Sequence, residues 1–354
     1  MKIGIFDPYL DDLGGGEKYM VTLAECLSLN NSVTVFWNKK DDLDKVAKRF
    51  SLNISKIRLK KNIFSPDYPF FKRCLDSLYY DAIIVLSDGS MPFVLSKKLF
   101  VHFQQPFPNL KMSIKTIIKK IRASSFFCNS YFTKSFIDRE FRINSQVLYP
   151  PIDIKARKIR KENIILHVGR FRTINIGSEN YKKQDVMIDL FKKMVDGGTK
   201  NWKLVLAIGL HQNDRPKFDN LRKKANGYPI EFLINLNNDK LSEAYSKSKI
   251  YWHATGYGED LSKNPELAEH FGISTVEAMG YGAVPVVINA GGQREIVEDK
   301  ISGYLWDTLE DFIDKTNRLI KSSKQWKEMS KEAVKRAEKF SGERFCKELV
   351  SIIR

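Results

Sequence analysis

The chain has 354 residues, of which 43% are hydrophobic, and 59 lysines and arginines against 42 aspartates and glutamates give it a net charge of +17. Since a domain usually has roughly 100–200 residues, this length predicts two domains, each able to bury a core. The charge favours anionic partners, namely nucleotides, phosphorylated lipids, membrane surfaces or nucleic acid. No run of about 18 apolar residues occurs, which excludes a membrane-spanning helix, and the start "MKIGIF" is too short for a signal peptide.

The four cysteines are scattered, without a C-x-x-C spacing or a neighbouring pair of histidines: Cys26, Cys74, Cys128 and Cys346. This pattern favours a reducing compartment and no structural zinc. We therefore expect a cytoplasmic protein.

Short apolar runs alternate with segments of helical period through the first half of the chain. The runs are "IGIF", "SVTVFW", "DAIIVLS", "LFVHF", "SFFCNS" and "QVLYP", and the helical segments include "GEKYMVTLAECLSL" and "YFTKSFIDREF". Most runs are apolar throughout, which is typical of strands in a parallel sheet with helices over both faces.

The stretch "LKMSIKTIIKKIRA" predicts a basic amphipathic helix in this half. Its isoleucines and its cations fall on different faces, and they are Ile114, Ile117, Ile118 and Ile121 with Lys111, Lys115, Lys119, Lys120 and Arg122. Such a helix either lies on an anionic membrane, where each cation contributes about 1 kcal/mol, or covers the sheet with its lysines in solvent. The basic, aromatic stretch "KIRLKKNIFSPDYPFFKR" fits the same surface role or a mobile loop.

A proline pair and a run of charges in "YPPIDIKARKIRKEN" interrupt the alternation, and we place a domain boundary there. Afterwards come the strands "NIILHVG", "WKLVLAIG", "IEFLI", "KIYWHA", "AVPVVI" and "GYLW", with helices in "KKQDVMIDLFKKM", "DKLSEAYSKS" and "EDFIDKTNRLIKSS". The sequence therefore predicts an α/β protein with two doubly wound Rossmann-like domains, residues 1–152 and 153–340, facing each other across a cleft. The final helix, 341–354, either caps the second domain or crosses back to the first.

Open parallel sheets bind ligands in the loops that follow their strands. In the first such loop, Gly14, Gly15 and Gly16 precede a helix, where backbone N–H groups can approach a phosphate. The spacing is not G-x-G-x-x-G, so a dinucleotide site is only weakly indicated, and a turn without a ligand is the alternative. The adjacent acids Asp11 and Asp12 are not spaced as a metal-binding D-x-D and fit a solvated turn.

A second loop places Arg170 after a strand and Lys182 with Lys183 before a helix. Arginine offers a planar fork to phosphate oxygens and lysine a mobile charge, so these side chains could hold a diphosphate. The alternative is three exposed cations in a basic protein, which we favour for Lys183.

The third loop contains two carboxylates, Glu269 and Glu277, in "AEHFGISTVEAMGYGAVPVVINAGG". Ser274 or Thr275 could cap a helix with Glu277 in its first turn, where the helix dipole would stabilise the acid. That explanation omits Glu269, whereas a ligand rich in hydroxyl groups would engage both acids. A pair of hydrolase carboxylates about one sugar bond is the rival interpretation.

Two glutamates with seven residues between them, followed by "AMGYGAVPVV", resemble the donor-site signature of retaining GT-B glycosyltransferases of family 4, the glycosyl transferases group 1. The resemblance continues, in chain order, through "GGGEKY", "CNSYFTKSFI", "LYPPID", "HVGRF", "KKQDVMIDLF" and "AGGQREIVEDKISGYLW". "EHFGI" is similar to the mannosyltransferases that extend lipid-linked oligosaccharides, and "WHATGYGED" upstream of it to bacterial relatives.

The resemblance implies a role for each matching residue. Glu269 would hold hydroxyl groups of the donor sugar, and Glu277 the ribose of its nucleotide. Arg170 and Lys182 would neutralise the leaving diphosphate. His102, in "VHFQQPFP", would lie near the transferred sugar, although a lone histidine after an apolar strand is more often structural. Further donor contacts would come from Gly15, Gly16, Leu236, Phe271, Gly272 and Ile273.

The chemistry implied by these roles is electrostatic. Breaking an anomeric bond to a diphosphate places negative charge on the leaving group, which fixed cations and helix N-termini can stabilise without a metal or another cofactor. No nucleophile is evident at the sugar, which suits retention by attack on the same face. The segment "RTINIGSENY" is longer than in the family pattern, so Lys182 and Lys183 are alternatives for the phosphate contact.

We therefore expect a hexosyltransferase that moves a mannose- or glucose-type sugar from a GDP- or UDP-sugar to a saccharide or lipid-linked acceptor. It would serve cell-surface polysaccharide or glycolipid assembly, on the cytoplasmic face of the membrane if the basic helix binds there. The alternatives are a sugar-nucleotide epimerase or phosphorylase of the same fold, and a non-catalytic protein that binds nucleotides or nucleic acid. Nucleic acid gains nothing from two acids in its site, so we expect no nucleic-acid partner.

Overall fold

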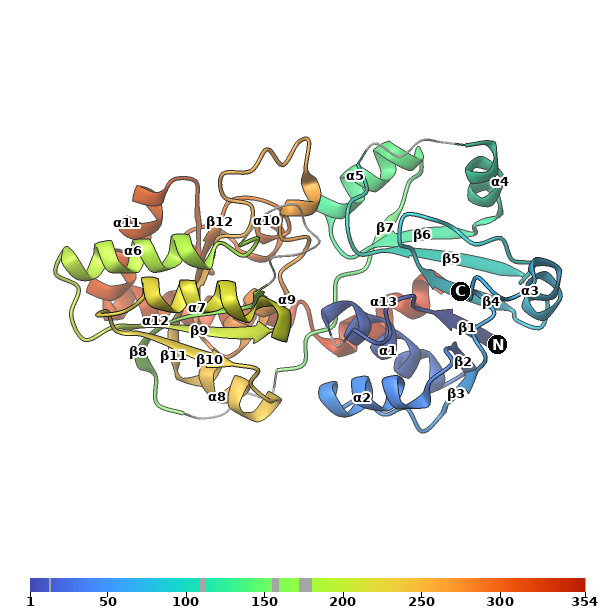
Figure 1. The fold of residues 1–354 in the computed structure, drawn as a ribbon, viewed down its shortest axis with the longest axis horizontal. Coiled ribbons are helices and arrows are strands. Elements are labelled where there is room, and N and C mark those ends of the chain that lie inside the picture. Colours follow the sequence, from blue (N-terminus) through green and yellow to red (C-terminus); the bar gives the residue numbers. More distant parts are fainter. Residues whose placement is uncertain (13, 109–112, 155–158, 172–179, 354) are drawn as a thin grey trace. The chain divides into compact units, whose positions relative to one another are not determined.

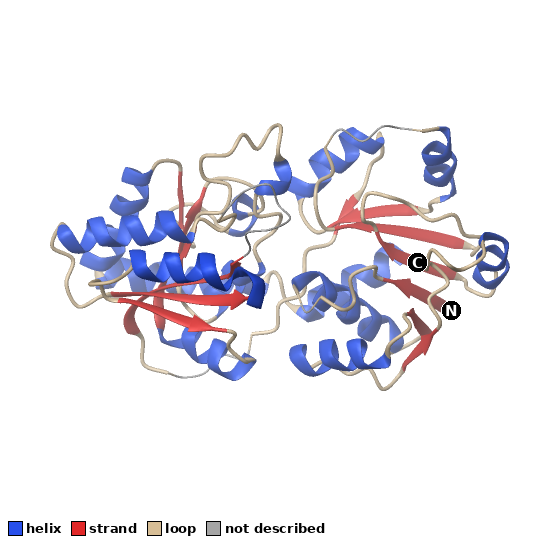
Figure 2. Cartoon of the chain, in the orientation of Figure 1, coloured by secondary structure: helices blue, strands red, loops and turns tan. Residues whose placement is uncertain are grey.

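The computed structural model describes residues 1–12, 14–108, 113–154, 159–171 and 180–353. The chain divides into two compact units, one made of Met1–Pro151 with Gly342–Arg354 and the other of Ile152–Ser341 (Figure 1). Each unit is built on one parallel sheet with helices packed against it (Figure 2). No helix within the described ranges is long and apolar enough to cross a membrane.

In the described part of the first unit, seven parallel strands form a sheet in the order β3-β2-β1-β4-β5-β6-β7. They are β1 (Lys2–Phe6), β2 (Ser32–Phe36), β3 (Ile57–Lys60), β4 (Ala82–Leu86), β5 (Lys98–Phe103), β6 (Ser125–Cys128) and β7 (Gln146–Val147). The helices are α1 (Gly15–Ser28), α2 (Lys40–Phe50), α3 (Phe70–Ser77), α4 (Ile114–Arg122), α5 (Tyr131–Phe141) and α13 (Gly342–Ile353). Every residue of the central strand β4 is buried, so both faces of the sheet are covered there.

The second unit repeats this plan, with six parallel strands among its described residues in the order β10-β9-β8-β11-β12-β13. They are β8 (Glu162–Phe171), β9 (Lys203–Leu210), β10 (Ile230–Ile234), β11 (Ser248–His253), β12 (Val284–Ile288) and β13 (Tyr304–Trp306). The helices are α6 (Gln184–Asp196), α7 (Arg215–Lys224), α8 (Asn238–Lys247), α9 (Ile273–Gly280), α10 (Gln293–Ile296), α11 (Leu309–Lys321) and α12 (Ser323–Glu338), with short 3₁₀ turns at Gln212–Asp214 and Pro265–Leu267.

The two parallel sheets confirm the predicted α/β class with two Rossmann-like halves. Strand β3 is the one strand of the first sheet that has no counterpart among the predicted apolar runs. It alternates half-buried and exposed residues in a basic stretch, so it lacks the continuous apolar signal of its neighbours. The segment 56–73 therefore contains a strand and the start of α3 rather than a loop alone.

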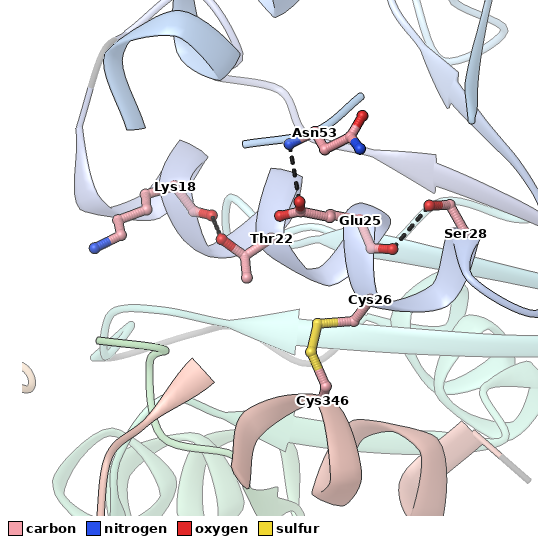
Figure 3. The surroundings of a disulfide bond; sticks show 7 residues. All are labelled: Lys18, Thr22, Glu25, Cys26, Ser28, Asn53 and Cys346. Atoms are coloured by element: carbon pink, nitrogen blue, oxygen red, sulfur yellow. Dashed lines mark hydrogen bonds between the residues drawn. A yellow bond between two sulfur atoms is a disulfide. The ribbon is translucent and has the colours of Figure 1, made fainter. Parts of the chain in front are cut away.

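The C-terminal helix α13 packs on α1 within the first unit. Cys26 of α1 and Cys346 of α13 form a disulfide with Cα atoms 5.4 Å apart (Figure 3), whereas Cys74 and Cys128 are buried thiols. The disulfide does not agree with the reducing compartment that the scattered cysteines favoured, because sequence spacing does not show that the last helix returns to a segment 320 residues earlier. The cysteines therefore no longer support the expected cytoplasmic location.

Candidate active site

Three side chains from distant parts of the second unit meet at the carboxyl ends of its strands. His253 is the last residue of β11, Lys182 precedes α6, and Glu269 precedes α9. Because the strands are parallel, the loops that follow them lie at one edge of the sheet. Lys182 Nζ lies 2.7 Å from Glu269 Oε2, and His253 Nε2 lies 2.8 Å from the same oxygen.

The electrostatics of this cluster keep Glu269 ionised. Burial disfavours the charged carboxylate, but Lys182 and His253 outweigh it and hold the pKa of Glu269 well below its usual range. Burial also acts against the charge on Lys182, but Glu269 and Tyr181 outweigh it and raise the pKa of the lysine. Both observed bonds use Oε2, so Glu269 Oε1 keeps its acceptor capacity within the described part of the chain.

His253 is almost completely buried, with 1% of its surface exposed. Burial lowers its pKa despite the neighbouring carboxylate, so the ring is neutral. The carboxylate of Glu269 can only accept, which assigns the ring hydrogen to Nε2. The hydroxyl of Thr255 lies 3.2 Å from the same nitrogen. His253 was not among the predicted site residues, although it ends an apolar strand and lies in the motif "WHATGYGED".

Lys183 is held apart from this cluster. Its Nζ lies 2.6 Å from Glu259 Oε1, and its backbone takes a left-handed conformation with φ of 55° just before α6. Of the two lysines that the sequence offered as alternatives, the structure therefore brings Lys182 to Glu269. Residues 172–179, most of the long segment before it, lie outside the described residues.

Helix α9 begins at a tight backbone turn beside Glu269. Gly272 has φ of +116°, and a side-chain carbon there would lie 2.7 Å from Gln293 Nε2, so the position requires glycine. Its carbonyl accepts from the N–H groups of Thr275 and Val276. The first N–H groups of a helix have no acceptor within it, so those that follow the buried Phe271 can serve an anion.

Glu277 does not cap this helix. The helix begins at Ile273, earlier than expected from Ser274 or Thr275, which places Glu277 in its second turn. The explanation of Glu277 as a first-turn acid is therefore wrong. Instead, the hydroxyl of Tyr245 in α8 donates to its Oε2 at 2.9 Å.

Arg170 and Leu236 lie at the carboxyl ends of two strands of this sheet, Arg170 within β8 rather than after it as the sequence predicted. Arg170 stands near the end of β8, where it pairs with Gly209 of β9 and its carbonyl accepts from Gln184 at 3.3 Å. Leu236 follows β10 and is half-buried, one residue after Asn235, whose side chain bonds both backbone groups of Leu210.

The remaining predicted site residues lie in the first unit. Gly15 is the first residue of α1, and a side-chain carbon at Gly16 would lie 2.5 Å from Gln104 Oε1, so any larger residue there would have to displace the Gln104 side chain. His102 is fully buried between the rings of Tyr19 and Phe127, at centroid distances of 4.2 and 4.5 Å. Burial lowers the pKa of His102 to about 3, so it is a neutral hydrogen-bonding group.

The two parallel sheets covered by helices define a class of fold, GT-B. The structure is similar to a glycosyltransferase from Rickettsia africae, with a TM-score of 0.79 and 14% identity over 99% of this chain and 97% of that one. It is also similar to HepE of Anabaena in complex with UDP, with a TM-score of 0.75 and 15% identity over 100% and 99%. At these identities the likeness concerns the fold alone, which confirms the predicted one.

The family model described as glycosyl transferases group 1 matches residues 151–338, and the chain belongs to this family. GDP-Man:Man(3)GlcNAc(2)-PP-Dol alpha-1,2-mannosyltransferase of Dictyostelium discoideum is 28% identical over 61% of this chain and 43% of that protein. Alpha-1,3/1,6-mannosyltransferase ALG2 of the same organism is 24% identical over 100% of this chain and 98% of that protein. The chain thus spans less than half the length of the first of these relatives. The family inferred from the motifs is confirmed.

Proposed function

We propose that the protein is a retaining hexosyltransferase that moves mannose from GDP-mannose to a saccharide or lipid-linked acceptor. The observation that carries this proposal is the pairing of Lys182 with Glu269 beside the first turn of α9. The cluster combines a fixed carboxylate, which suits sugar hydroxyls, with a cation and helix amides, which suit a diphosphate. The relatives named for GDP-Man support the choice of sugar and base.

The roles proposed for Glu269, Lys182 and Glu277 rest on contacts described above, and those of Arg170 and Leu236 on their places at the ends of strands. Glu269 accepts sugar hydroxyls, because its charge is fixed and one oxygen is available. Lys182 moves from Glu269 to the diphosphate when the donor binds, and Arg170 joins it there. Glu277, oriented by Tyr245, holds the ribose. In the same scheme Leu236 contacts the base, and Phe271 to Ile273 offer their amides to the diphosphate.

The reaction is carried by charge at the leaving group. The diphosphate gains negative charge as the anomeric bond breaks, and Lys182, Arg170 and the start of α9 stabilise it. With these cations we propose that the enzyme needs no metal. The acceptor hydroxyl attacks from the face that the diphosphate leaves, which gives retention.

A thermal-shift panel with GDP, UDP, ADP and their hexose derivatives tests the donor. GDP and GDP-mannose are expected to raise the melting temperature, because a ligand at 100 times its dissociation constant stabilises the folded state by about 2.7 kcal/mol. The nucleotide sugar that gives the shift is then used in transfer assays. These assays are run with and without EDTA, to test the need for a metal, and with and without an acceptor. Absence of a shift with every nucleotide would overturn the proposal, and isomerisation of the sugar nucleotide without an acceptor would favour the epimerase.

We also propose that α4 binds an anionic membrane. Ile114 and Ile121 are 78% and 77% exposed, and Ile117 and Ile118 are 41% and 52% exposed, so the isoleucines do not cover the sheet. Instead, Lys120 donates to two backbone carbonyls at 3.3 Å, and Arg122 donates to the carbonyl of Ser96. These cations fasten the helix to the unit while its apolar face points outward. Lys111 and the side chain of Lys115 lie outside the described residues.

Helix α3 also carries exposed apolar side chains. Phe70 and Phe71 are 50% and 81% exposed. The ring of Phe70 lies 6.0 Å from Phe93, in the segment that also supplies the carbonyl bonded by Arg122. Both helices therefore contact one connecting segment at the same end of the unit (Figure 1). Apolar side chains in a basic unit suit a bilayer with anionic headgroups.

Flotation with vesicles of phosphatidylcholine and phosphatidylglycerol tests this surface. The wild-type protein is expected to float with the vesicles, and the double variant Ile114→Glu with Ile121→Glu to stay in solution. Ile301→Glu, at an isoleucine 54% exposed in the second unit, is the matched control and should float. Equal flotation of all three proteins, or of none, would refute the proposal.

A further inference from the structure

The carboxylate of Glu269 has two hydrogen-bond donors on one oxygen, and they differ in how they are held. Lys182 precedes α6 on a loop and reaches Glu269 through a long side chain. His253 ends β11, a strand with neighbours on both sides in the sheet. A short side chain on an interior strand has little conformational freedom, whereas a lysine can change partners.

This inference rests on the proposed function, in which only one of the two hydrogen-bond donors stays on Glu269 when the nucleotide sugar binds. When the nucleotide sugar binds, Lys182 has to turn toward the diphosphate, and its bond to Glu269 weakens. Glu269 must nevertheless stay in place to accept hydroxyls of the sugar. His253 is then the one remaining donor to this carboxylate among the described residues.

We propose that His253 is a positioning residue, which keeps Glu269 aimed at the donor sugar while Lys182 serves the diphosphate. The ring is 1% exposed, so the surrounding side chains leave the imidazole little room to rotate, and the hydroxyl of Thr255 lies 3.2 Å from the same ring nitrogen. Since His253 is neutral, it orients Glu269 without cancelling the negative charge that makes it a strong acceptor. A second cation there would orient Glu269 equally well but would weaken it as an acceptor.

Two replacements separate positioning from packing. His253→Leu fills the same buried space with an apolar side chain that has no hydrogen-bond donor. His253→Gln has a side-chain N–H group that can reach the carboxylate of Glu269. We expect His253→Leu to lower kcat/KM about tenfold to 100-fold, as for the loss of one charge-assisted hydrogen bond. His253→Gln should recover most of that loss. The dissociation constant for GDP, which lacks the transferred hexose, should change by less than about twofold in both.

A double-mutant cycle with Glu269→Gln provides the second measurement. If His253 acts through Glu269, adding His253→Leu to Glu269→Gln should lower kcat/KM by less than about threefold further. Fully additive losses, or equal losses in the leucine and glutamine variants, would overturn the inference. If wild-type protein neither binds nor turns over any nucleotide sugar, the proposed function fails instead. Should His253→Leu not fold, His253→Phe, which keeps a planar ring without a donor, takes its place in both measurements.

Discussion

Replacing Glu269 with glutamine is expected to lower hexose transfer about 100-fold while the affinity for GDP stays within about twofold. Glutamine has nearly the same shape, but it removes the negative charge that Lys182 and His253 stabilise. Hydrogen bonds to an ionised acceptor contribute about 1.5–3 kcal/mol each, so weaker bonds to sugar hydroxyls account for the loss. Steady-state kinetics and isothermal titration with GDP measure the two quantities.

The matched control is Glu259→Gln. Glu259 forms the neighbouring ion pair with Lys183, with a similar separation of 2.6 Å and similar burial. It has no role in the proposed site. Transfer by Glu259→Gln should therefore stay within about threefold of the wild type, a smaller free-energy change than the loss of one hydrogen bond to a charged group. Full transfer by Glu269→Gln, or equal losses in both variants, would contradict the hydroxyl-binding role of Glu269.

Replacing Lys182 with methionine is expected to lower kcat by about 100- to 1000-fold, the usual effect of removing one group that stabilises transition-state charge. It should also destabilise the second unit by about 3 kcal/mol, because a buried carboxylate loses its charged partner. Lys183→Met is the control, and its kcat should stay near the wild-type value. Equal effects of the two replacements would contradict the proposal that Lys182 leaves Glu269 and binds the diphosphate.

The same variant has a defined pH dependence. In the wild type, the pKa of Glu269 is well below its ordinary value of 4.5, so its stabilising contribution is present above that pH and is lost only as the pH falls through the lowered pKa. Without Lys182 the pKa of Glu269 rises, so less stability depends on its ionisation. We expect the difference in unfolding free energy between the wild type and Lys182→Met to be largest above pH 4.5 and to narrow as the pH falls, as measured by denaturant unfolding at a series of pH values. Adding Glu269→Leu should restore stability but not transfer, since an apolar pair can replace a buried ion pair.

The sequence alone predicted the parallel sheets and the family, because buried strands leave continuous apolar runs and the motifs stand in a fixed order. It did not predict the start of α9, since Ser274 and Thr275 resemble capping residues while the turn depends on the positive φ of Gly272. Nor could it show that Lys182 and Glu269, 87 residues apart, form one ion pair. The expected roles placed them on different parts of the donor.

The role of His253 and the orientation of α4 depend on tertiary contacts, which the sequence does not show. His253 is one apolar-strand histidine among several until the carboxylate beside it is known. The four isoleucines of α4 have the spacing of a helix that covers a sheet, and only their exposure and the bonds of Lys120 and Arg122 show the opposite orientation.

The placement of α13 has a consequence for the order in which the protein folds during synthesis. Three of its side chains, Phe345, Leu349 and Ile353, are at most 1% exposed in the core around α1, and Cys346 supplies half of the disulfide. Residues 152–341 leave the ribosome before them, so the second unit can complete its core while the first lacks part of its own. The part of the chain that is made first therefore finishes folding last.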